Sequence, residues 1–142
     1  MPTTILLTPP SERSTQRATM ESWQTIPIPA KREPLGFSAC FDAAESETLK
    51  RGFVPSDMDD RWFICFDAGW LRFYRSWTGI CIFGLRLEPG PSGTCIMDSW
   101  VNREPDQYRG VDLKNDRELV QRLIHELLLH KSGVVDDQGQ NE

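Results

Sequence analysis

Residues 61–88 hold most of the chain's aromatic side chains, in three short apolar runs separated by two turn sequences. Asp67-Ala68-Gly69 and Ser76-Trp77-Thr78-Gly79 both contain the small, polar and glycine residues of hairpin turns. Because strands joined by such short loops pair with their neighbours in antiparallel fashion, the segment predicts three consecutive strands. We place them at about 62–66, 70–75 and 80–88.

The first turn also predicts which side chains share a face of the sheet. A two-residue turn at Ala68-Gly69 pairs Phe66 with Leu71. The next pair on the same face is Ile64 with Phe73. Continuing the alternation through the second turn predicts that the opposite face of the third strand carries Cys81, Phe83, Leu85 and Leu87.

Two further elements flank these three strands. Residues 94–101 resume an alternating pattern after a Pro- and Gly-rich break and predict a fourth strand. Upstream, Asp42 can cap a helix, Glu45 follows three residues later and Gly52 supplies a stop. These signals predict a short helix of about nine residues before the sheet.

A C-terminal amphipathic helix is predicted over residues 116–131. Asn115 with Glu118 resembles a capping box, and Gly133 is a stop signal. Apolar residues recur between them at helical spacing, namely Leu119, Val120, Leu123, Ile124, Leu127 and Leu128. We therefore predict an α+β fold: an antiparallel four-stranded meander sheet packed by this helix, with the short helix before the sheet.

Length and composition fit one folded domain. A chain of 142 residues with 39% hydrophobic and 26% charged residues can bury one core of ordinary size. Six of the ten prolines fall in the first 34 residues, so we expect a Pro/Ser/Thr-rich flexible arm over 1–34, in which Trp23, Ile26 and Ile28 can dock on the domain. A single α+β domain then spans 35–133, and an acidic polar tail spans 134–142.

Charge and hydropathy restrict the partners of the chain. A net charge of −5 disfavours general nucleic-acid binding, which needs an excess of basic residues. No apolar run approaches the roughly 20 residues of a membrane span, so we expect no membrane contact and a cytoplasmic location. In that compartment the cysteines are interpreted as reduced core residues, with disulfides as the less favoured alternative, at Cys40, Cys65, Cys81 and Cys95.

No motif predicts a catalytic or metal centre. His125 and His130 are five residues apart, so on a helix they point in different directions, unlike a helical metal-binding pair. Ser76 has neither a GxSxG elbow nor a neighbouring base. We therefore expect no cofactor and no metal, and a binding role rather than an enzymatic one.

The string Arg72-Phe73-Tyr74-Arg75-Ser76-Trp77-Thr78-Gly79 is the strongest candidate for a ligand site. Guanidinium groups bind phosphate or carboxylate, aromatic faces bind rings, and N–H groups in turns can receive an anion. The alternative is that the arginines extend into solvent and the turn is only hairpin chemistry. The candidate residues here are Arg72, Arg75, Ser76, Trp77, Thr78 and Gly79.

A second candidate cluster is the polar loop that follows the fourth strand, within residues 100–109. If this loop folds beside the Ser76-Trp77-Thr78-Gly79 turn, Arg103 and Arg109 can surround one anionic ligand together with Arg75. The alternative is an ordinary solvated loop. The candidates added here are Asn102, Arg103 and Arg109.

Three strings in these regions resemble an uncharacterised family of small bacterial α+β domains. They are Arg61-Trp62-Phe63, Arg75-Ser76-Trp77-Thr78-Gly79 followed by Cys81-Ile82, and Val101-Asn102-Arg103 with a later Tyr108. The resemblance covers about residues 57–129. Some relatives are linked to ADP-ribosylglycohydrolase-type domains, which implies an accessory role near ADP-ribose or NAD chemistry. The resemblance assigns no catalytic residue to this chain.

These observations support two functional hypotheses. In the first, the chain is a binding or accessory domain that recognises an ADP-ribose- or nucleotide-like anionic small molecule through the Arg/Trp-rich turn. In the second, it is a protein-protein interaction module, such as an immunity-type or regulatory partner or a homodimer, that uses an apolar sheet face. Its interface anchors would then be Trp70, Tyr74 and Phe83, because aromatic side chains dominate such interfaces.

Overall fold

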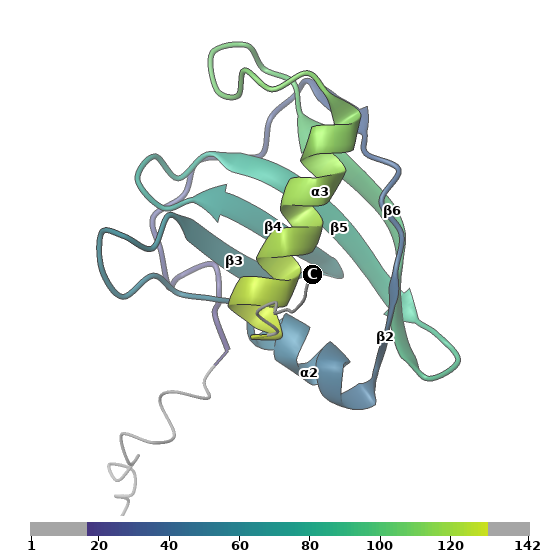
Figure 1. Cartoon of the computed structure of the whole chain (residues 1–142). Coiled ribbons are helices and arrows are strands. Elements are labelled where there is room, and N and C mark those ends of the chain that lie inside the picture. The colour runs from purple at the N-terminus through teal and green to yellow at the C-terminus, as the bar shows by residue number, and fades with distance from the viewer. Residues whose placement is uncertain (1–16, 131–142) are drawn as a thin grey trace, which may run out of the picture.

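The structure, a computed structural model, describes residues 17–130 and shows an antiparallel sheet with helices on one face (Figure 1). The strands are β1 (Arg32–Pro34), β2 (Cys40–Asp42), β3 (Trp62–Asp67), β4 (Trp70–Arg75), β5 (Cys81–Pro89) and β6 (Gly93–Asn102). The helices are α2 (Ala43–Arg51) and α3 (Leu113–Leu123), which continues as the π-helical segment η2 (Ile124–Leu128). The order in the sheet is β1-β6-β5-β4-β3, and β2 also pairs with β6. The predicted α+β class and antiparallel sheet are confirmed.

The sheet has six strands among the described residues, so the predicted four-stranded meander is wrong in strand number. The four predicted strands are present as β3 to β6, and β1 and β2 extend the sheet beyond β6. Each additional strand has only three residues, which is too short for a recognisable alternation of apolar and polar side chains. β1 ends with Pro34, a residue that sheets tolerate at an edge.

The first hairpin has the predicted register, and the second does not. Phe66 lies opposite Leu71 and Ile64 opposite Phe73, as expected from a two-residue turn. Between β4 and β5, however, a β-bulge shifts the register, so that Tyr74 pairs with Cys81 while Phe73 pairs with Phe83. Because one extra residue reverses the alternation, the predicted facing is wrong for three of the four residues, namely Phe83, Leu85 and Leu87.

The helices cover the face of the sheet that carries Phe73 and Phe83. In Figure 1, α3 crosses the strands on this face, and α2 lies below its C-terminal end. α3 and η2 bury Val120, Leu123, Ile124 and Leu128 in the main apolar core, which confirms part of the predicted stripe. The helix begins earlier than predicted, because Asp112 rather than Asn115 caps it. The predicted end at Gly133 lies outside the described residues.

The short helix α2 forms where the capping residues predict it. The Glu45 amide donates to the Asp42 carboxylate at 2.7 Å, and the Asp42 amide donates to the Glu45 carboxylate at 3.1 Å. Gly52 ends the helix with a φ of 74°, a left-handed value that glycine adopts without steric cost. The local sequence was therefore sufficient to predict this element.

The described part of the N-terminal arm, residues 17–34, covers the other face of the sheet before its last three residues pair with β6 as β1. Ala18 is buried against a second apolar cluster that contains Phe63 and Tyr74. Trp23 stacks on Phe63 with ring centroids 6.2 Å apart, and its indole N–H donates to the Ser76 carbonyl at 2.9 Å. The second apolar face is thus covered by the chain itself.

The cysteines divide into two kinds. Cys65 and Cys81 are buried free thiols in the cluster beneath the arm, as expected for core residues. Cys40 and Cys95 are cross-strand neighbours on β2 and β6 and form a disulfide, so their interpretation as reduced core residues is wrong. The spacing of cysteines along a chain does not reveal which of them become neighbours across a sheet.

A membrane-spanning helix is absent from residues 17–130. No helix in this part of the chain combines the length and the apolar composition needed to cross a bilayer.

Removing the disulfide should lower the free energy of unfolding by about 2–4 kcal/mol, the range typical of native disulfides. The bond closes a loop with a sequence separation of 55 residues, so its loss increases the entropy of the unfolded chain. Urea denaturation of a Cys40→Ser/Cys95→Ser variant measures this change. A reducing agent should destabilise the unaltered protein and leave the variant unchanged; equal stability of the two proteins would contradict the assignment.

Replacing Trp23 with alanine should lower the free energy of unfolding by about 2 kcal/mol, because it uncovers Phe63 and removes the bond to Ser76. Trp77→Ala is the matched control, since the Trp77 side chain is 61% exposed and its loss should cost less than about 1 kcal/mol. Chemical denaturation of both variants provides the comparison. Equal costs would show that the arm does not seal this face.

Candidate functional site

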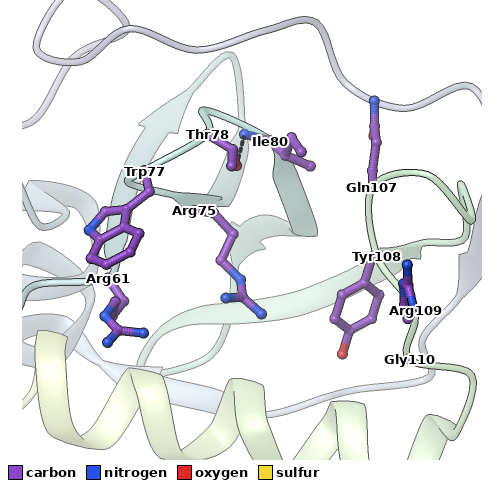
Figure 2. A pocket seen from close by; sticks show the side chains of 9 residues that line it. All are labelled: Arg61, Arg75, Trp77, Thr78, Ile80, Gln107, Tyr108, Arg109 and Gly110. Carbon is purple, nitrogen blue, oxygen red and sulfur yellow. Dashed lines mark hydrogen bonds between the residues drawn. The ribbon is translucent and has the colours of Figure 1, made fainter.

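A cleft of about 440 Å³ lies where the β4–β5 turn meets the loop that follows β6 (Figure 2). We call it the arginine cleft. Figure 2 shows Trp77 and Arg61 on one side, Tyr108 and Arg109 on the other, and Arg75 between them. The lining residues are Arg61, Arg75, Trp77, Thr78, Ile80, Gln107, Tyr108, Arg109 and Gly110.

Two cation–π pairs hold Arg61 and Arg75 at the arginine cleft. The guanidinium carbon of Arg75 lies 4.9 Å from the centroid of the Trp62 ring, and that of Arg61 lies 4.7 Å from the Trp77 ring. The pairing of β3 with β4 explains both contacts. Trp62 is opposite Arg75, and beyond this pair the Ser76 amide donates to the Arg61 carbonyl at 2.8 Å. Each arginine therefore stacks on a tryptophan from the opposite arm of the hairpin.

Tyr108, an aromatic residue in the lining of the arginine cleft, connects the cleft to the main core. The rings of Trp62 and Phe83 are stacked at 6.1 Å, and the Phe83 and Tyr108 rings meet edge to face at 6.3 Å. Also in the lining, the Nε atom of Arg75 is buried and has no hydrogen-bond partner among the described residues. A buried donor without an acceptor is costly, so an acceptor supplied by a ligand would be favourable here.

The lining is strongly positive. It contains Arg61, Arg75 and Arg109 and no carboxylate. Within residues 17–130, none of these three arginines forms an ion pair, whereas Arg72, Arg86 and Arg103 each pair with an acidic residue. The positive charge of the arginine cleft is therefore not neutralised by the part of the chain that the structure describes.

A network centred on Asp116 holds the loop wall of the cleft. Asp116 is 2% exposed, and it accepts hydrogen bonds from the Tyr108 hydroxyl at 2.6 Å and from Arg103 Nη2 at 2.8 Å. Arg103 also donates to Glu33 at 2.7 Å and to the Gly110 carbonyl at 2.9 Å. Arg103 thus links the loop to β1 and to α3, and its donors are used within the chain.

The structure brings four of the predicted site residues into the arginine cleft, namely Arg75, Trp77, Thr78 and Arg109. Arg72 lies on the opposite face of β4, where it pairs with Asp67 at 3.6 Å. The side chains of β4 alternate between faces, so residues 72 and 75 are separated as their odd spacing requires.

The remaining predicted residues have structural partners or lie beside the cleft. Asn102 is fully buried, and its amide donates to the Cys81 carbonyl and to the Gln107 side chain, each at 2.9 Å. Ser76 donates to the Asp60 carbonyl at 2.7 Å. Gly79 lines a neighbouring hollow rather than the arginine cleft.

Five lining residues were not among the predicted site residues: Arg61, Ile80, Gln107, Tyr108 and Gly110. Arg61 could have been found, because the predicted first-hairpin register extends to a position opposite Ser76. The loop residues carry no comparable signal, since their position depends on the contact between Tyr108 and Asp116.

Comparisons with protein families, curated proteins and solved structures find no match to this chain. The described residues also contain no cluster of three or more His, Cys, Asp or Glu side chains able to hold a metal ion. The class defined by the fold and the site is therefore an α+β domain with a positively charged, aromatic cleft.

The two tyrosines of the chain should titrate at unusually high pH in the folded protein. Burial, followed by the nearby Cys81 thiol, raises the pKa of Tyr74 to about 12. Burial and then the hydrogen bond to Asp116 also raise the pKa of Tyr108 above its ordinary value. Both shifts favour the neutral phenol in the folded state, whereas phenols in the unfolded chain ionise near about pH 10.

The contribution of the two neutral phenols to the free energy of unfolding is fully present below about pH 10. It is lost as the pH rises towards the pKa values of the tyrosines in the folded state. The ultraviolet absorbance of phenolate measures this titration. The folded protein should show little phenolate at about pH 10, where the urea-unfolded chain is half ionised. Coincident titrations of the two states would contradict the buried positions of Tyr74 and Tyr108.

Proposed function

We propose that this chain is a ligand-binding or accessory domain whose arginine cleft recognises an anionic, ring-bearing ligand of nucleotide or ADP-ribose type. The observation that carries the proposal is the convergence of Arg61, Arg75 and Arg109 on one cleft, without ion-pair partners among the described residues. Planar guanidinium groups suit phosphate oxygens, to which they can donate two parallel hydrogen bonds.

The aromatic residues support the ring-bearing part of the proposal. Trp77 is 61% exposed, and Arg61 stacks on its ring. An exposed indole can stack on a base or a similar ring, and such stacking contributes about 1–3 kcal/mol per base. A volume of about 440 Å³ is within the usual range of small-molecule sites.

The lining residues support binding rather than catalysis. They are arginines, aromatic residues, Thr78, Ile80, Gln107 and Gly110, none of which is an ordinary general base at neutral pH. The Tyr108 hydroxyl is engaged by Asp116. The resemblance to relatives linked with ADP-ribosylglycohydrolase-type domains makes ADP-ribose a suitable probe.

The alternative hypothesis of an apolar interaction face receives less support. Two of its expected anchors, Tyr74 and Phe83, are buried within the chain, Tyr74 beneath the arm and Phe83 beneath the helices. A protein partner would have to displace these layers before it reached either side chain. We therefore do not propose this face as an interface.

Calorimetric titration with AMP, ADP-ribose, NAD and a short RNA tests the proposal. At least one mononucleotide-like compound should bind, and Arg75→Gln should weaken binding by about 10- to 100-fold, the value of hydrogen bonds to a charged group. Trp77→Ala should lower the affinity for the same ligand, because the stacking contact with its ring is lost.

Two arginine variants serve as controls. Arg86→Gln removes a half-buried arginine that pairs with Glu88 and lies opposite Trp70, at the end of β4 remote from the arginine cleft. Arg72→Gln removes the candidate on the opposite sheet face. Both should bind as the unaltered protein does. Absence of binding by all four compounds, or binding that is insensitive to Arg75→Gln, would end the proposal.

A further inference from the structure

A second hollow adjoins the arginine cleft and shares Trp77 and Thr78 with it. This arm-side hollow has a volume of about 410 Å³ and lies between the β4–β5 turn and the N-terminal arm. Its lining residues are Trp23, Gln24, Thr25, Ile26, Ser76, Trp77, Thr78 and Gly79, none of which is charged. The two adjacent hollows therefore differ in charge, one with three arginines and the other neutral.

The arm is held closely against the turn, so the arm-side hollow is a defined feature of the fold. The Ile26 amide donates to the Gly79 carbonyl at 3.0 Å, and the Trp23 indole donates to the Ser76 carbonyl at 2.9 Å. Gly79 has a φ of +75°, and a Cβ atom there would lie 2.7 Å from the Gln24 carbonyl oxygen. Only glycine permits this approach of the arm.

Polar groups in the arm-side hollow are available to a ligand. The side-chain amide of Gln24 and the side-chain hydroxyl of Thr25 have no hydrogen-bond partner within residues 17–130. The Thr78 hydroxyl oxygen accepts from the Ile80 amide at 3.2 Å, which leaves its proton free to donate. Neutral donors and acceptors of this kind suit hydroxyl or amide groups rather than a phosphate.

Building on the proposed function, we infer that the arm-side hollow binds the uncharged part of the same ligand whose anionic group occupies the arginine cleft. The ligand class is then a phosphate ester of a hydroxyl- or amide-bearing ring, with Trp77 between its two parts. A run of stacked bases fits less well, because the Trp23 ring is packed on Phe63 and leaves Trp77 as the exposed tryptophan.

The division of the ligand between the two hollows is tested by titrating the unaltered protein and a variant with two ligands, and by comparing the loss of affinity for each ligand. AMP carries both parts, and inorganic pyrophosphate carries only the anionic part. In a Gln24→Ala/Thr25→Val variant, AMP should bind about tenfold more weakly, as expected from the loss of one or two hydrogen bonds, while pyrophosphate binds as before. Arg75→Gln should lower the affinity for both AMP and pyrophosphate.

Hydrogen exchange of the Ile26 amide, which donates to Gly79, shows whether the arm stays docked in the variant. Protection should be retained, since neither substitution alters this bond. Equal weakening of AMP and pyrophosphate, or no weakening of AMP, would overturn the inference while leaving the arginine cleft as the anion site. Failure of the unaltered protein to bind AMP would overturn this inference, while the proposed function would still be decided by the titrations with ADP-ribose, NAD and RNA.

Discussion

The pairing of β3 with β4 is the constraint on which the rest of the structure depends. With Ile64 opposite Phe73, one face of the hairpin is directed to the helices, while Phe63 and its partner on β4 face the arm. At the open end of the hairpin the same register stacks Arg75 on Trp62. A slip of one residue would exchange the two faces and remove the arginine from the cleft, so core and site share one determinant.

A buried ion pair has a comparable role on the opposite side of the cleft. Asp116 is almost fully buried, and Arg103 and Tyr108 both donate to it. A buried carboxylate that lost its partners would be strongly destabilising, so the loop is held to α3 at this point. The sequence predicted Arg103 as a ligand-binding residue together with Arg75 and Arg109, but its donors are used within the chain. Its contribution to the site is to position Tyr108, through Asp116, and Gly110.

Much of the fold could be predicted because local chemistry decides it. The Asp42 cap of α2 and the turn after Asp67 use contacts between residues close in sequence. The bulge between Phe73 and Tyr74 could not be predicted, because no residue pattern in the sequence indicates a one-residue insertion in the ladder. The insertion nevertheless changes which face of the sheet the later side chains of β5 occupy. The Cys40–Cys95 pair and the three-residue strands β1 and β2 likewise depend on which distant segments meet along β6.

The same division holds for the site. The sequence alone determined that Arg75, Trp77 and Thr78 would gather at one hairpin turn, because a tight turn keeps its residues together whatever surrounds them. Only the tertiary structure decided that Arg109 would join them, that Arg72 would not, and that the arm would close a neutral hollow beside them. Those outcomes rest on contacts between segments far apart in the chain. Such contacts form only when the core assembles and offsets the entropic cost of bringing the segments together.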